Sequence, residues 1–96
     1  MASRHYPIRR HSVWFEAGGG MVRLKLWSDG EREVAELGFL DPDRRLPAAQ
    51  VSAALDHGVG FLPQTSLLPL LTLLAQPTTV YVLLDDDPVG SLCIHT

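Results

Sequence analysis

The residues best suited to chemistry lie near the end of the chain, where the single cysteine is followed two positions later by a histidine. In a strand, Cys93 and His95 would face the same side, because side chains alternate faces with a period of two. A thiol beside an imidazole is the pair that cysteine nucleophiles use, but that chemistry also needs an oxyanion hole and an orienting third group. The sequence supplies neither, so it predicts a protein without enzymatic activity.

The sequence supports a metal site or a phosphate site no better than it supports a cysteine nucleophile. The spacings typical of zinc sites, Cys-x-x-Cys and His-x-x-x-His, do not occur. Residues 85–87 are three consecutive aspartates, whereas calcium loops place their carboxylates at alternate positions. The glycine run 18–20 lacks the spacing of a phosphate-binding loop, and a strand rather than a helix is expected after it. We therefore interpret both runs as turns and expect neither a metal ion nor a cofactor.

Two tryptophans form the surface that most strongly indicates binding. Trp14 and Trp27 fall on the polar face of their predicted strands, together with Arg23 and Arg32. Exposed tryptophans are typical of a protein-partner surface, of a platform for a small molecule or, less readily, of a surface on which bases stack. The alternative is that the chain's own N-terminal arm or a loop covers them.

The composition fits one small globular domain over residues 1–96, with a loosely held basic arm at residues 1–10. The chain is 46% hydrophobic and carries a net charge of −3. A chain of this length buries about 60% of its unfolded surface, so its core is thin. All eight Lys and Arg residues lie at or before Arg45, and the acidic second half disfavours nucleic acid. One cysteine, no signal-peptide pattern and no bilayer-length apolar stretch favour a cytoplasmic location and no membrane contact.

Alternating apolar and polar residues predict a meander of three strands, over residues 12–16, 21–27 and 32–40. Two-residue turns at the glycine-containing junctions would place Val13 opposite Leu24, and Leu24 opposite Ala35. The same register places Trp27 opposite Arg32, where a cation–π contact would form. The meander would thus have one apolar face and one polar face.

Two helices and a hairpin are expected to follow. Pro47 suits the first turn of a helix over residues 48–56, and Ser66 suits the N-cap of a leucine-rich helix that ends at Ala75. At helical spacing the inner face of the second helix consists of Leu67, Leu70, Leu71 and Leu74. Residues 78–84 and 89–95 form the hairpin, with Tyr81 opposite Leu92, and both of its faces are largely apolar.

Together these elements predict an α+β fold in the order βββααββ, with a mostly antiparallel five-stranded sheet and two helices packed on one face. We predict a non-catalytic protein-interaction domain that forms a homodimer, because so small a chain leaves apolar surface uncovered. Its candidate interface is Leu68, Leu73, Trp14, Trp27, Arg23 and Arg32. The alternative is a small-molecule binding module with an apolar pocket between the leucine-rich helix and the sheet. The candidate pocket residues are Tyr81, Ser91, Cys93 and His95.

Overall fold

In a computed structural model that describes residues 2–18, 21–86 and 90–96, the chain forms an α+β fold. The described residues contain a five-stranded sheet of order β2-β3-β4-β6-β5, a three-stranded sheet of order β1-β7-β8, and one α-helix. The strands are β1 (Ser3–Pro7), β2 (Arg10–Trp14), β3 (Val22–Trp27), β4 (Glu33–Leu40), β5 (Gln50–Val51), β6 (Gly58–Pro63), β7 (Tyr81–Asp85) and β8 (Ser91–His95). A short 3-10 helix η1 (Gln64–Ser66) leads directly into α1 (Leu67–Leu74).

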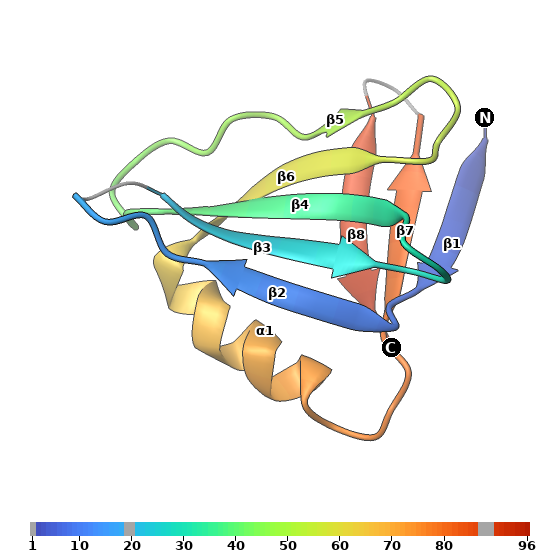
Figure 1. Ribbon diagram of the computed structural model, residues 1–96. Helices are drawn as coiled ribbons and strands as arrows, with labels where there is room; N and C mark the ends of the chain where they lie inside the picture. The colour runs from blue at the N-terminus through green and yellow to red at the C-terminus, as the bar shows by residue number, and fades with distance from the viewer. Residues whose placement is uncertain (1, 19–20, 87–89) are drawn as a thin grey trace.

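The two sheets lie face to face and enclose the core. In Figure 1 the strands of the three-stranded sheet run steeply across those of the five-stranded sheet, behind it. Crossed packing is one of the two common arrangements of stacked sheets. The buried side chains come from both layers, among them Leu24, Leu37, Phe39, Val82 and Leu84. The predicted leucine-rich helix is confirmed as α1, and its predicted inner face, Leu67, Leu70, Leu71 and Leu74, packs against this core.

The N-terminal segment takes part in both sheets. β1 pairs with β7. After a connection of two residues, β2 pairs with β3. At the corner between them, the N–H of Ile8 donates to the carbonyl of Val80 and the N–H of Arg9 donates to the carbonyl of Trp27, each at 2.8 Å. Residues 3–10, for which the sequence suggested a loose arm, are therefore held by backbone hydrogen bonds. Tyr6 adds a side-chain link, because its hydroxyl donates to the carbonyl of Leu55 at 2.5 Å.

The predicted meander is present, with one change of register. The β2–β3 pair joins Val13 to Leu24 as predicted. The β3–β4 pair joins Leu24 to Leu37 rather than to Ala35, because the connection between these strands is longer than a two-residue turn. A shift of two residues keeps every side chain on its face, so the apolar side of the meander still meets the core. The predicted turn residues Gly19 and Gly20 lie outside the described residues.

The predicted single sheet and the first predicted helix are wrong. Residues 48–56 form no helix, and Gln50–Val51 is the short strand β5. Ser52 supplies the physical reason, because its Oγ accepts the N–H groups of Asp56 and His57 at 3.1 Å each and turns the chain back. The segment after this turn, which the sequence indicated was a connector, is β6, and it pairs in parallel with β4. The five-stranded sheet is therefore mixed, and the C-terminal strands belong to a second sheet.

Glycines obscure β6 in the sequence because they disfavour strands. One of the two, Gly58, is nevertheless required by the packing on the inner side of the strand. A Cβ at Gly58 would lie 2.7 Å from Cδ2 of Leu84, so a side chain there would collide with the second sheet. A Cβ at Gly60 would lie 3.4 Å from Cδ2 of Leu37 and 3.9 Å from Leu92, which is ordinary contact. Gly60 therefore leaves open a space that a side chain could occupy.

The C-terminal hairpin is present in a different register from the predicted one. Tyr81 pairs with His95, and Val82 pairs with Ile94. The shift from the predicted partner Leu92 is three residues, and an odd shift exchanges the faces of β8 relative to β7. Leu92 and Ile94 consequently face the core, while Cys93 is exposed. Asp87 and Val89, which the sequence assigned to the turn and to the second strand, lie outside the described residues.

Candidate functional site

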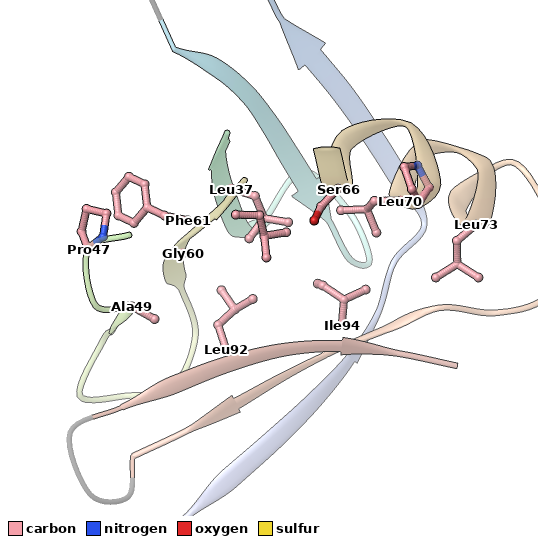
Figure 2. Close-up of a pocket in the computed structure, with 12 residues that line it drawn as sticks. Leu37, Pro47, Ala49, Gly60, Phe61, Ser66, Leu70, Leu73, Leu92 and Ile94 are labelled. Atoms are coloured by element: carbon pink, nitrogen blue, oxygen red, sulfur yellow. The ribbon is translucent and has the colours of Figure 1, made fainter. Parts of the chain in front are cut away.

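A pocket of about 420 Å³ lies between α1, β6 and β8. Figure 2 shows side chains from the helix, both sheets and the loop before β5 converging on it. Its volume falls within the range of about 300–1,000 Å³ that is typical of small-molecule sites. The walls formed by strands and loop consist of Leu37, Pro47, Ala49, Gly60, Phe61, Leu62, Leu92 and Ile94. The wall formed by η1 and α1 consists of Ser66, Pro69, Leu70 and Leu73.

Local periodicity explains why the apolar side chains converge. Leu70 and Leu73 are three residues apart, so they lie on neighbouring turns of the same helix face. Leu92 and Ile94 are two residues apart on β8, so they point to the same side of the strand. These two pairs line the pocket from α1 and from β8, and Gly60 lines it from β6. Gly60 contributes to the pocket by leaving space open on the inner side of β6.

Ser66 provides the polar group of the pocket. Of the described lining residues, it alone carries a polar side chain. Although Ser66 precedes α1, its hydroxyl makes no capping hydrogen bond in the described structure. The reason is that Ser66 is the last residue of the 3-10 helix η1 and has helical dihedral angles, φ −86° and ψ −11°, whereas a capping serine is usually extended. Its oxygen points into the pocket (Figure 2) and is able both to donate and to accept a hydrogen bond there.

The electrostatics of the pocket favour an uncharged occupant. No described lining residue has an ionisable side chain. A charged group that entered would lose hydration without gaining a counter-charge, and burying an unpaired ion is costly. A neutral, mostly apolar molecule loses little on entry and gains the free energy of removing apolar surface from water.

The pocket residues predicted from the sequence lie elsewhere. Tyr81, Ser91, Cys93 and His95 belong to the three-stranded sheet, and the described pocket is lined from β8 by Leu92 and Ile94 instead. Two of the predicted residues do meet: the His95 ring stacks on Tyr81 with centroids 5.6 Å apart. The described ranges contain no group of three or more His, Cys, Asp and Glu side chains placed to hold a metal ion.

The predicted interface residues are divided between two surfaces. Trp14, Trp27 and Arg23 come from β2 and β3 on the outer side of the five-stranded sheet. Leu68 is exposed on α1, and its predicted companion Leu73 lines the pocket instead. Arg32 belongs to neither surface. Its guanidinium pairs instead with Oδ2 of Asp56 at 2.9 Å.

A positively charged side chain lies over each tryptophan ring on the outer sheet face. The guanidinium carbon of Arg10 lies 4.6 Å from the ring centroid of Trp27, directly across the β2–β3 pair. The ammonium of Lys25 lies 4.9 Å from the ring centroid of Trp14. Arg10 thus takes the cation–π position that the sequence assigned to Arg32. These contacts stabilise the exposed ring of Trp14 and the half-buried ring of Trp27.

A polar cluster holds the turn between β5 and β6. The Ser52 hydroxyl donates to Asp56 at 2.6 Å, and Nε2 of His57 lies 2.7 Å from a carboxylate oxygen of Glu33. The hydrogen bond from Ser52, together with the charge of Arg32, lowers the pKa of Asp56. The arrangement fixes the turn, and each of its groups already has a partner within the chain.

Asp56→Asn should reduce stability near neutral pH and have little effect in acid. Because folding lowers the pKa of Asp56, the ionised carboxylate stabilises the fold at pH values above the ordinary value of 3.8. That contribution disappears as the pH falls through the lowered pKa. Urea unfolding of the two proteins from about pH 7 to about pH 2 should therefore show a gap in stability that closes in acid. Asp43→Asn, at an exposed loop position, is the control, and a gap for Asp56→Asn that stays constant across this range would contradict the account.

Comparisons of the chain with protein families, with curated proteins and with solved structures find no match. None of the helices in the described ranges has the length and apolar character needed to cross a membrane.

Proposed function

We propose that the protein binds a small, uncharged and largely apolar molecule in the pocket between α1, β6 and β8. The observation that carries the proposal is a space of about 420 Å³ with apolar walls and one polar side chain, Ser66. Binding sites for small molecules are commonly of this kind, with greasy walls that supply affinity and a few polar groups that fix orientation. The proposal includes no chemical step.

The walls and the hydroxyl would have separate roles. Leu70, Leu73, Leu92 and Ile94 would remove apolar ligand surface from water, which contributes about 25 cal/mol per Å². The Ser66 hydroxyl would hydrogen-bond to an alcohol, a carbonyl or an amine on the ligand. A hydrogen bond of this kind contributes about 0.5–1.5 kcal/mol, so it would orient the ligand more than it would hold it.

The proposal predicts that the pocket discriminates by charge. N-phenyl-1-naphthylamine should bind saturably, with a rise in its fluorescence. 1-Anilinonaphthalene-8-sulfonate has the same rings and a sulfonate, and it should bind at least about tenfold more weakly, because the pocket offers no cation to the buried anion. A fluorescence titration of both dyes into the folded protein makes the comparison. Equal affinity for the two dyes, or no binding of the neutral dye, would overturn the proposal.

A second candidate function is self-association as a homodimer. Two neighbouring aromatic side chains favour it, since Trp14 is 56% exposed and Phe15 is 73% exposed. Large aromatic side chains in such positions are typical of protein–protein contact surfaces. Symmetric dimers are also the commonest assembly of soluble chains, and they bury the same patch twice.

A further inference from the structure

The outer face of the five-stranded sheet carries a hollow beside an exposed ring. The hollow has a volume of about 180 Å³ and is lined by Met21, Arg23, Glu36, Gly38, Val59 and Phe61. A second depression of about 170 Å³ adjoins it, because Met21 and Arg23 line both. Phe15 lines this second depression, and its ring is 73% exposed. A hollow and a protruding ring thus share one surface.

We propose that two copies of the chain associate through this face, each placing Phe15 into the partner's hollow beside Gly38. The inference rests on the self-association proposed above and specifies the surface. A two-fold contact uses one patch on both copies, so the inserting group and its receiving site must lie on the same patch. Phe15 and the hollow meet that requirement, since they are joined through Met21 and Arg23.

The size of the hollow favours a side chain over a free ligand. About 180 Å³ is well below the range of about 300–1,000 Å³ that small-molecule sites occupy. The lining is also adaptable. Met21 is flexible, and its sulfur lies only 2.5 Å from where a Cβ of Gly38 would be, so this side chain already covers the glycine. A shift of Met21 would deepen the hollow without movement of the backbone.

The charges on this face suit a second copy of the same chain. Glu36 lines the hollow together with Arg23, and Glu16 lines the adjoining depression with the same arginine. A surface that presents both signs is able to pair its own acids and bases across a two-fold axis. Nucleic acid would need a predominantly basic surface, because its affinity comes largely from phosphate contacts. The acidic neighbours of Arg23 therefore favour a protein copy over a single strand.

Phe15→Asp tests the assignment, with Leu68→Asp as the matched control. Both side chains are 73% exposed in the single chain, so neither change should unfold it. Light scattering from about micromolar to several hundred micromolar protein should show a dimer for the parent and for Leu68→Asp. The dimer dissociation constant of Phe15→Asp should rise at least about thirtyfold, as expected for a central aromatic anchor. Circular dichroism and binding of N-phenyl-1-naphthylamine should be unchanged, which confirms that the variant is folded.

Other outcomes distinguish self-association itself from the surface assigned to it. A dimer that survives Phe15→Asp but is lost in Leu68→Asp would keep self-association and overturn the assigned surface. A parent protein that is monomeric at every concentration would overturn both. The Trp27→Phe variant gives a second measurement, because Trp14 beside Phe15 is then the sole tryptophan. Its emission should shift to the blue as the concentration rises. A shift caused instead by a single-stranded oligonucleotide would overturn the proposed occupant.

Discussion

Gly60→Val should abolish binding of N-phenyl-1-naphthylamine and leave the protein folded. The β-carbon fits, because it would meet Leu37 and Leu92 at 3.4 and 3.9 Å, and the two methyl groups would then occupy the pocket. A β-branched residue also suits a strand better than glycine does, so the free energy of unfolding should stay constant or rise. We expect the dissociation constant of the dye to rise more than about tenfold, which corresponds to a loss of more than about 1.4 kcal/mol. Gly60→Ala should have an intermediate effect.

Val59→Ile is the matched control for this experiment. Val59 precedes Gly60 on β6 and lines the hollow of the outer face, so the added methylene lies away from the pocket. Its dye affinity, measured by the same fluorescence titration, should equal that of the parent. If Gly60→Val bound the dye as tightly as the parent, the dye would be binding somewhere other than beside β6.

Phe39→Ala should cause the largest loss of stability of any substitution considered, about 3–5 kcal/mol. Phe39 has no exposed surface, and it pairs with Val22 on β3 and with Leu62 on β6 in the middle of the five-stranded sheet. Removing its ring leaves a cavity in the hydrophobic core. A domain of this size is stable by only about 5–15 kcal/mol, so the variant should be partly unfolded at moderate temperature.

Phe15→Ala provides the comparison for Phe39→Ala, because it removes the same atoms from a ring that is 73% exposed. Urea denaturation at low micromolar concentration, where association is minimal, should show a change within about 0.5 kcal/mol for Phe15→Ala. A cost below about 1 kcal/mol for Phe39→Ala would mean that this ring is not buried in the core.

The elements that were predicted correctly are those with a strong local pattern. The alternation of residues 21–27 is clear, and the pairing of Val13 with Leu24 follows from it. The leucine-rich helix has apolar residues at helical spacing, and α1 lies where this pattern places it, although the predicted cap by the Ser66 hydroxyl does not form. In both cases the side chains that determine the element lie within the element itself.

The elements that were missed depend on partners distant in the sequence. β6 contains two glycines, and the need for one of them, Gly58, becomes apparent only when Leu84 and Leu92 approach from the other sheet. The segment before it has helical spacing of apolar residues, but the Ser52 hydroxyl stabilises a turn there instead.

The residues that line the pocket also depend on pairing between strands. The sequence indicated a pocket against the leucine-rich helix, and a pocket lies there, but the residues assigned to it were the wrong ones. The register of β8 determines which of its side chains face inward, and a shift of three residues exchanged Cys93 and His95 for Leu92 and Ile94. The polar residues in and beside that hairpin do not indicate, from the sequence alone, the register in which β8 pairs with β7.

The central claim is that the space beside α1 binds a neutral apolar molecule, and methyl NMR during a titration with N-phenyl-1-naphthylamine tests it most directly. The account predicts that the methyl signals of Leu70, Leu73, Leu92 and Ile94 move together and saturate, while that of Leu68 on the exposed side of α1 stays in place. Shifts confined to residues outside the pocket, with these four side chains unmoved, would contradict it.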